Sequence, residues 1–549
     1  MYYRHLHWLG LTWLITGLTM ACQPQQKKAD SPSIAQVICR TEPVDQAWYA
    51  SGKKAPLFDS LGDLHFPIST QNQEVQRYFN QGMMLAVGFN HAEAARSFHE
   101  ATRLDSTSAM AHWGFAYVLG PNYNAGMEPD NYQRAYAAIQ KALKYSSTAT
   151  EKEKALIMAL AKRYPAQPVD DRKPYDEAYS KALREVYTRY PDDVTVGALF
   201  VESIMDMHPW DLWDKDGNPQ PWTPEIVSTL EKMIRQDPNH IAPHHFYIHA
   251  VEASTTPERG LNSAAVLGRL APGASHLLHM PSHIYIRTGD YHEGTKANQQ
   301  AVLADSSYLT SCHAQGAFPL AYFPHNYHFM AATATMEGDS QAAMLAARKV
   351  AEFTNKELLA EPGWATLQHY YTIPYHVALK FSLWDEVLRM AQADTLRLKY
   401  PVAIRHYARG LALLEKGQTD KAKAELAQLE KLSTDPAIAT LTIWDINTMT
   451  SILEIARRVL KAEIMAREGR YDTSISLLRE AVALEDQLNY NEPPDWFFSV
   501  RHALGNVLLK ANRQAEAEAV FKRDLEIFPR NVWALKGLQA ARKDRITRR

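Results

Sequence analysis

Histidines gather in the middle of the chain, in a pattern that favours metal binding. Eleven of the 22 histidines fall between residues 240 and 328. The densest stretch, "PHHFYIHAVEAS", carries His244, His245, His249 and Glu252. On a helix that turns by about 100° per residue, the last three of these lie within about 60° of one another. They would present three ligand atoms to one point.

Two further histidine clusters follow in the segments "SHLLHMPSHIYIR" and "FPHNYHFMA". Their members are His276, His279, His283, His325 and His328. Pro281 leaves open whether the first segment is one helix or a turn followed by a helix. The two histidines of the second segment lie one turn apart.

An imidazole nitrogen suits zinc, copper or iron, and two histidines with one carboxylate leave coordination positions open for chemistry. The sequence therefore predicts a site for a divalent transition metal with the ligands His245, His249, Glu252, His279, His283, His325 and His328. Two alternatives stay open: the histidines contact a bound peptide or other ligand, or they make only structural hydrogen bonds. The H-E-x-x-H pattern of zinc proteases does not occur.

A repeat with a period near 34 residues predicts the elements that position these side chains. Its contact positions are clearest in "YFNQGMMLAVGFNHAEAARSFHEATRLD", at Gly82, Ala94, Phe98 and Ala101. Small residues let paired helices approach each other, and aromatic residues fill the gaps between pairs. We expect an all-α fold, an α-solenoid of tetratricopeptide-type helix pairs, with helices over 73–104, 109–123, 282–304, 455–484 and 500–528.

In such a solenoid, the first helices of successive pairs line a concave groove. The histidine clusters fall at or just before such helices, so they are predicted to converge on the groove. Donor nitrogens from separate clusters must come within about 4 Å of a common point to share a metal.

A long aromatic loop, "MHPWDLWDKDGNPQPWTPE" at residues 207–225, interrupts the repeats. Trp210 and Trp213 argue against disorder because tryptophans pack, so we expect this loop to cap the groove. Its acidic residues also match part of a calcium-loop frame, but a proline stands where that loop needs glycine. Tyr247 and Tyr285 are predicted to line the groove with the tryptophans.

The segment "YNEPPDWFFSVRHALG" supplies the last groove candidates, Glu492 and Trp496. Two consecutive prolines block a helix there, so both residues sit on a stiff connector before the last clear repeat. The connector is either a packed turn between repeats or a segment that folds over the groove as part of the site.

Residues 1–21 resemble a bacterial lipoprotein signal peptide, in which an apolar run ends in "LTMAC". An ordinary secretory signal is the alternative. We expect Cys22 to carry lipid and residues 22–60 to form a flexible tether. Repeats with the histidine-rich groove then occupy 61–360, and further repeats occupy 361–549. Whether Cys39 and Cys312 form a disulfide or stay free is left open by their spacing.

The overall charge argues against a nucleic-acid partner. Lys and Arg number 59 against 61 Asp and Glu, which leaves a formal charge of -2. Such a balance creates no global field that would attract a polyanion. No other stretch is long and apolar enough to cross a bilayer, so membrane contact is expected through the lipid anchor alone.

Several segments together resemble a widespread family of exported bacterial tetratricopeptide-repeat proteins. They include "HHFYIHAVEAS", "HMPSHIYIRTGDYHEGTKANQQAV", "PHNYHF" and "EDQLNYNEPPDW", and the similarity runs from about residue 61 to the C-terminus. The resemblance implies the helical-repeat fold but no particular reaction. It also implies, from Gln23 after the cysteine, an outer-membrane location facing the periplasm. The positions that match the family are His245, His249, Glu252, His279, His283, His325, His328, Glu492, Pro493, Pro494 and Trp496.

Two functions follow from these features. The first is a lipid-anchored scaffold whose groove, with its histidine-rich ligand or metal site, binds a peptide or protein partner. The alternative is a metal-dependent hydrolase or oxidase that uses the His/Glu cluster. Nucleophilic catalysis is not indicated, because the chain has no G-x-S-x-G motif, no plausible catalytic cysteine and no glycine-rich phosphate loop.

Overall fold

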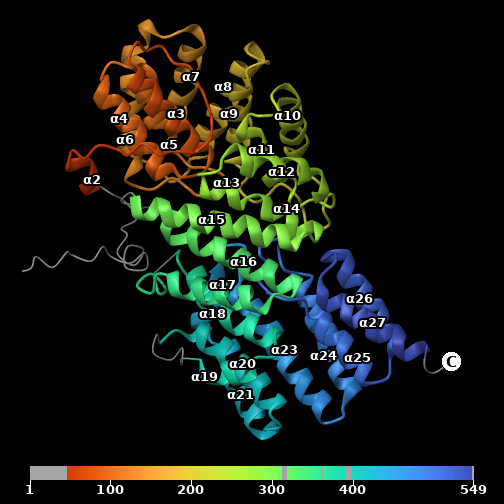
Figure 1. Cartoon of the computed structure of the whole chain (residues 1–549). Coiled ribbons are helices and arrows are strands. Elements are labelled where there is room, and N and C mark those ends of the chain that lie inside the picture. Colours follow the sequence, from red (N-terminus) through yellow and green to blue (C-terminus); the bar gives the residue numbers. More distant parts are fainter. Residues whose placement is uncertain (1–45, 312–317, 362, 391–396, 547–549) are drawn as a thin grey trace, which may run out of the picture.

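The computed structural model describes residues 46–311, 318–361, 363–390 and 397–546 (Figure 1). Its regular structure is almost entirely helical, apart from two short strands, β1 (Thr442–Ile443) and β2 (Asn447–Thr448), that form one antiparallel ladder. The all-α prediction is confirmed. The predicted signal peptide, Cys22, Cys39 and Cys312 lie outside the described residues.

The helices follow one another along the chain in short, regularly spaced elements. Up to the histidine-rich region they are α2 (Gln46–Ala50), α3 (Gln73–Val87), α4 (His91–Leu104), α5 (Ala109–Val118), α6 (Asn131–Tyr145), η1 (Ser146–Thr148), α7 (Glu151–Ala161), α8 (Lys173–Arg189), α9 (Val194–Met205) and α10 (Thr223–Gln236). The histidine-rich region comprises α11 (Ile241–Val251), η2 (Pro257–Gly260), α12 (Leu261–Leu270), α13 (Ser275–His279), α14 (Pro281–Thr288), α15 (Tyr291–Ser311), η3 (Phe318–Tyr322) and α16 (Phe323–Glu337). The remainder comprises α17 (Ser340–Phe353), α18 (Thr366–Lys380), α19 (Trp384–Arg389), α20 (Lys399–Glu415), α21 (Thr419–Ser433), α22 (Pro436–Ala439), α23 (Met449–Arg467), α24 (Tyr471–Glu485), α25 (Arg501–Lys510), α26 (Gln514–Ile527) and α27 (Val532–Ile546).

Neighbouring helices pack in pairs, and each pair packs on the next. Thus α3 packs on α4, α16 on α17, α20 on α21 and α23 on α24, while α4 contacts α5 and α17 contacts α18. Short turns join the helices of each pair. Gly289, for example, adopts a φ of 79° directly after α14, a left-handed conformation that glycine tolerates without strain. The fold is the predicted α-solenoid of tetratricopeptide-type helix pairs.

The same packing device occurs at both ends of the solenoid. A Cβ atom on Gly82 would lie 2.7 Å from the ring of Phe98, and one on Gly114 would lie 2.3 Å from it. At the other end, Gly505 and Gly537 each place a hypothetical Cβ 2.3 Å from the ring of Phe521. One buried phenylalanine therefore fills the space that two glycines of adjacent helices leave open.

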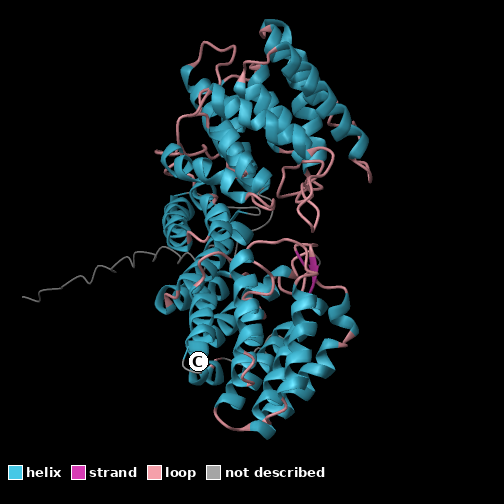
Figure 2. Ribbon diagram, turned by 90° about the vertical axis from the view of Figure 1, so that its right-hand side faces the viewer, coloured by secondary structure: helices cyan, strands magenta, loops and turns pink. Residues whose placement is uncertain are grey.

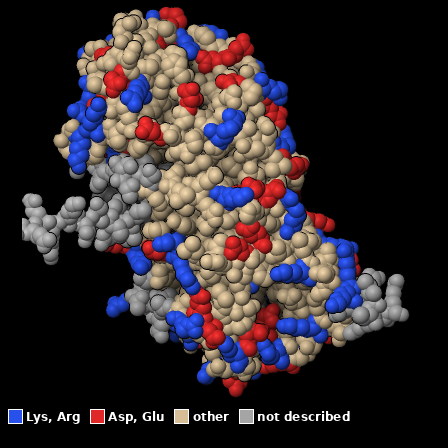
Figure 3. Space-filling model, in the orientation of Figure 1, with Lys and Arg blue, Asp and Glu red and all other residues tan. Residues whose placement is uncertain are grey.

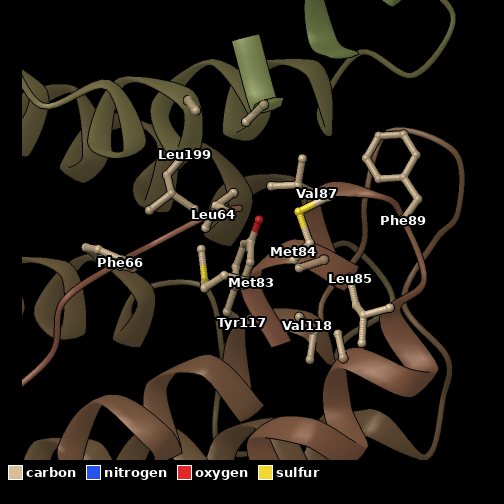
Figure 4. Close-up of a cluster of buried hydrophobic side chains, with 14 of the residues drawn as sticks. Leu64, Phe66, Met83, Met84, Leu85, Val87, Phe89, Tyr117, Val118 and Leu199 are labelled. Atoms are coloured by element: carbon tan, nitrogen blue, oxygen red, sulfur yellow. The ribbon is translucent and has the colours of Figure 1, made fainter. Parts of the chain in front are cut away.

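The buried apolar residues form two clusters that divide near α14. The first runs from Trp48 to Ile284, and the second from Ile286 to Ala541. Figure 4 shows part of the first cluster, with Val87 at the end of α3 and Phe89 in the turn that follows. The histidine-rich helices lie at the junction of the two clusters.

The C-terminal repeats fold back against the middle of the chain (Figure 1). Arg530 donates to the carbonyl oxygen of Thr288 and to Oδ1 of Asp290, both at 2.7 Å. On another side, Lys215 donates to the carbonyl oxygen of Gln487 at 2.7 Å. In Figure 2, loops of the upper helices face loops and the two short strands of the lower helices.

The surface carries no single dominant charge. On the face drawn in Figure 3, basic and acidic side chains are interspersed, in keeping with the formal charge of -2. Among the described helices, none combines the length and the apolar character that a membrane span requires.

Candidate metal centre

Helix α11 positions the first cluster. All of its residues from Ile241 to Val251 are buried, so the helix has no solvent face, and its polar side chains must find partners inside the protein. His245 and His249 lie one turn apart on it, and Glu252 follows as its C-cap residue. The 100° rotation per residue places all three on one side, as the sequence predicted.

Pro281 divides the second cluster between two helices. It occupies the first turn of α14, where a missing N–H costs no helical hydrogen bond, and Met280 joins this helix to α13. The segment is therefore two short helices. They carry His276 and His279 on α13 and His283 on α14.

The first trio consists of His245, His249 and His276, which offer ligand atoms within 4.8 Å of one another. Nδ1 of His245 donates to the carbonyl oxygen of Val87 at 2.7 Å. This carbonyl ends α3, where no helical N–H can reach it. The hydrogen bond fixes the ring so that Nε2 of His245 faces Nε2 of His276 at 3.2 Å. Nε2 of His249 is buried with no hydrogen-bond partner among the described residues.

The second trio consists of His279, His283 and His325, again with ligand atoms within 4.8 Å. Nδ1 of His279 donates to Oδ1 of Asn298 at 2.7 Å, and the amide of Asn298 is oriented by its own bond to the carbonyl of Gly294 at 2.8 Å. Nε2 of His279 and Nε2 of His283 lie 2.9 Å apart. Helix α16 brings His325 to the pair, with ring centroids 4.9 Å from His279 and 6.1 Å from His283.

Two carboxylates connect and orient the trios. Glu252 accepts from Nδ1 of His249 at 2.8 Å through one oxygen and from Nδ1 of His283 through the other. Oε2 of Glu492 lies 3.2 Å from the same nitrogen of His283. Glu252, His283 and Glu492 thus form a third possible ligand group within 4.8 Å. The connector residue Glu492 folds over the centre.

Burial dominates the electrostatics of the trios. It lowers the pKa of His245, His276, His279 and His325 well below the usual range, so these rings are neutral and can offer a lone pair. Burial also acts to lower the pKa of His283, but Glu252 and Glu492 outweigh it and raise that pKa to about 9. Conversely, burial acts to raise the pKa of Glu252, and the neighbouring His283 and His249 bring it below its usual range.

Two histidines differ from the prediction: His328 was a predicted ligand but lies outside both trios, and His276 was not predicted but belongs to one. His328 follows His325 on α16, but its ring stacks on Phe497 at 5.0 Å and belongs to neither trio. His276 does belong to a trio, although only its neighbours were predicted as ligands. The available signal was its spacing of three residues from His279, which places both on one face of a helix. His244 is structural, because Ser263 and the carbonyl of Pro238 each lie 2.9 Å from its nitrogens.

The two predicted tyrosines do not reach the trios. Tyr247 donates to Glu231 at 2.7 Å, toward α10. Tyr285 is half-buried against the first apolar cluster.

The tryptophan loop packs beside the centre. Trp210 stacks on Tyr123 and turns its edge to His249, with ring centroids 5.8 Å apart. Trp213 donates to the carbonyl of Ala250, the penultimate residue of α11, at 2.9 Å. Asp214 accepts from the backbone N–H groups of Asp216 and Asn218 at 2.9 and 2.8 Å. Since the loop itself satisfies this carboxylate, the geometry favours a tryptophan-pinned loop over a calcium loop.

Trp496 lies on the far side of Glu492. Its ring turns an edge to His376 and tilts against Tyr407, with centroids 5.9 and 5.6 Å away. The indole N–H is buried with no hydrogen-bond partner among the described residues.

The fold and this centre define the chain as an all-helical, tetratricopeptide-type repeat protein with buried histidine clusters. No protein-family model matches the chain, and no curated protein matches its sequence. Among solved structures, a human IFIT1 dimer with m7Gppp-AAAA is similar at 13% identity over 93% of this chain and 94% of that one, with a TM-score of 0.33. The P58(IPK) TPR domain is 11% identical over 87% and 99%, with a TM-score of 0.22. Yeast Tom70 is 12% identical over 87% and 90%, with a TM-score of 0.26.

Proposed function

We propose that this chain is a lipid-anchored protein of the bacterial cell envelope whose solenoid holds transition-metal ions at the two histidine trios. The anchor is Cys22, and the protein faces the periplasm from the outer membrane. Zinc, copper and iron are the candidate metals, because neutral imidazole is a ligand for all three.

The observation that carries the metal proposal is the contact between His279 and His283. Nδ1 of His279 faces an amide oxygen, and Nδ1 of His283 faces carboxylates. Such oxygens only accept hydrogen bonds, so each Nδ1 must carry the hydrogen. If His283 were neutral like His279, the two Nε2 lone pairs would face each other across 2.9 Å; because the pKa of His283 is about 9, either a proton on its Nε2 or a metal ion relieves this contact. A cation between the rings removes that repulsion.

The Nε2 atoms of His245 and His276, 3.2 Å apart, have the spacing of two ligands of one metal ion, and those of His279 and His283, 2.9 Å apart, lie slightly closer. Two ligands bound at about 2.1 Å from one ion lie roughly 3.0–3.4 Å apart. Oxygen partners for the second ring nitrogens are also present: Val87 for His245, Glu252 for His249 and His283, Asn298 for His279, and Tyr370, whose hydroxyl lies 3.2 Å from Nδ1 of His325. Such partners fix the tautomer of metal-bound histidines. When no metal is bound, a proton on His283 supplies the cation instead.

Burial weighs against the histidines as peptide contacts. The six rings of the trios are buried or nearly so, with His245 and His279 at 0% exposure. A peptide on the surface of the solenoid would not touch them. Binding of a peptide or protein partner, the other function that the repeat fold suggests, would use the exposed helical faces. Substitutions in the trios should therefore leave such binding unchanged.

The test is metal content. The protein, made without a histidine tag, is reconstituted separately with zinc, copper and iron, with and without oxygen, and the bound metal is measured by elemental analysis. We expect retained metal in the parent and reduced metal in His249→Ala and His279→Ala, with melting behaviour preserved. His292→Ala is the matched control, because that side chain is 66% exposed and belongs to neither trio. A parent protein that retains none of the three metals ends the metal proposal.

A further inference from the structure

A cavity of about 330 Å³ lies between the loop at residues 214–217 and the segment at 485–496. The bond from Lys215 to the carbonyl oxygen of Gln487 joins these two sides. The basic residues of the wall are Lys215, Arg287 and Arg501. Its acidic residues are twice as many: Asp214, Asp216, Glu485, Asp486, Glu492 and Asp495. We call this space the acidic cavity.

The two arginines of the wall are already balanced. Arg501 forms an ion pair with Asp486 at 2.6 Å. Arg287 donates to the carbonyl oxygen of Glu252 at 2.7 Å, and the carboxylates of Glu252 and Glu492 compensate its charge. That leaves one lysine for the other four acids of the wall.

Two of those four acids are held by neutral donors. The backbone N–H of Val500 donates to Oε2 of Glu485 at 3.0 Å, and the amides of Asn447 and Asn491 donate to Asp495 at 2.7 and 2.8 Å. Burial is the largest cause of the pKa shifts here: it raises the pKa of Glu485 to about 8 and that of Asp495 to about 7. A cation in the cavity would stabilise the charged form of both.

Glu492 connects the acidic cavity to the histidine centre. It lines the cavity, and its Oε2 lies 3.2 Å from Nδ1 of His283. The side chain is only 4% exposed, yet Oε2 makes no hydrogen bond among the described residues. This oxygen belongs to the possible ligand group of Glu252, His283 and Glu492. A buried carboxylate oxygen with no donor is a position at which a metal cation gains an oxygen ligand.

We propose that the acidic cavity is the entrance through which divalent metal cations reach the histidine centre, with Glu492 between the cavity and the ligands. A cavity lined by one sign of charge focuses the field and raises the local concentration of ions of the opposite sign. The role as an entrance rests on the proposed metal function, whereas the attraction of a cation to the cavity does not.

The first experiment probes the cavity independently of the histidines. Hexaamminecobalt(III) is a cation whose ammonia ligands do not exchange, so imidazole cannot bind its metal. Hexacyanocobaltate(III) is an anion of similar shape. Each is titrated by calorimetry into the full-length mature protein after a chelator has removed any metal. We expect saturable binding of the cation and none of the anion.

Two variants locate that binding. Asp216 is exposed and takes part in no ion pair within the described ranges, so Asp216→Lys reverses a charge of the wall without breaking a contact. It should weaken binding of the cation by at least about threefold at low ionic strength and by less at high salt, because salt screens exposed charges. Glu485→Gln keeps an oxygen for the N–H of Val500, so the melting temperature should be preserved while the affinity falls. Glu357→Lys is the control, at an exposed acid outside the cavity wall.

The second experiment tests entry. Cobalt(II) is mixed with the metal-free protein, and the rise in its visible absorption as imidazole nitrogens bind it gives the rate of uptake. Asp216→Lys should slow uptake by at least about threefold at low ionic strength, since a charge at the rim acts on the association rate. The amount of cobalt bound at equilibrium should stay the same, and Glu357→Lys should match the parent.

Each outcome decides a different point. Absent binding of the hexaammine cation, or equal binding in the parent and Asp216→Lys, overturns the cavity as a cation site. Equal rates of cobalt(II) uptake in the parent and both lysine variants overturn its role as an entrance. Binding of the hexaammine cation with no cobalt(II) retained at equilibrium supports the cation site, but it contradicts the proposed metal function and with it the entrance.

Discussion

His249 and His283 are held by the two oxygens of one carboxylate, that of Glu252. Nδ1 of His249 lies 2.8 Å from Oε1, and Nδ1 of His283 donates to Oε2. One histidine belongs to each trio, so a single buried side chain couples the two possible ion sites. The amide of Glu252→Gln has one oxygen and cannot accept on both sides.

Glu252→Gln should therefore lower metal affinity by about 10- to 100-fold, the usual effect of losing an orienting partner of a ligand. Titration with zinc against a competing chelator measures this change. Glu337→Gln is the control, because Glu337 also accepts from a histidine, but at the exposed His292. Equal zinc affinity in all three proteins would show that Glu252 does not orient metal ligands.

Gly82→Leu should destabilise the first repeat. The Cβ alone would lie 2.7 Å from the ring of Phe98, and the rest of the side chain would force the helices apart. Overpacking of this kind costs about 1–3 kcal/mol. Gly126→Ala is the matched change at a site where a Cβ meets nothing within 4 Å, and it should alter stability by less than about 0.5 kcal/mol. Urea denaturation of both variants checks the contrast.

Asp305 predicts a pH dependence of stability. Burial raises the pKa of Asp305 to about 7, although hydrogen bonds from Ser275 and Asn326 act to lower it. Between these two pKa values, the folded protein keeps a proton on Asp305 that the unfolded chain, in which the pKa is about 3.9, has released. Folded stability should fall as pH rises from about 4 to about 7, by up to about 1.4 kcal/mol per pH unit from this group.

Asp305→Asn removes that contribution, so the difference in unfolding free energy between parent and variant should change across this pH window. Asp420→Asn, at an exposed carboxylate, should leave the parent's pH profile unaltered. Parallel profiles for parent and Asp305→Asn would contradict the prediction.

Cys22→Ser should release the protein from the membrane fraction, because the several acyl chains of a bacterial lipoprotein are lost together. Cell fractionation followed by detection of the protein measures this. Cys39→Ser is the control and should remain with the membranes. A Cys22→Ser protein that stays as firmly bound as the parent would exclude the lipid anchor.

Much of the fold could be predicted from the sequence because its packing rests on residue size at fixed spacing. Gly82 and Phe98 mark a helix pair, since only a small residue allows the approach that the ring then fills. Phe98 also contacts Gly114, which lies on the next helix, and the sequence of the α3–α4 pair gives no indication of this contact. Helix pairs were therefore easier to predict than the way they stack.

The centre was less predictable, because it depends on which way each ring turns. The spacing of His325 and His328 is compatible with two ligands, yet the chain uses one for a trio and stacks the other on Phe497, which lies 169 positions away. The depth of burial was also hidden. A concave face was expected, whereas α11 is buried along its whole length, by α10 and α12 next to it in the chain and by distant elements such as the turn at Phe89.

The connector that carries Glu492 has a consequence for how the protein matures. Both trios come from residues 245–325, but the carboxylate of Glu492 arrives from a much later part of the chain. A nascent chain that had emerged only to residue 485, or a proteolytic fragment ending there, would contain every histidine of the trios and lack this partner of His283. The centre is thus completed last, only after the final repeats have been synthesised.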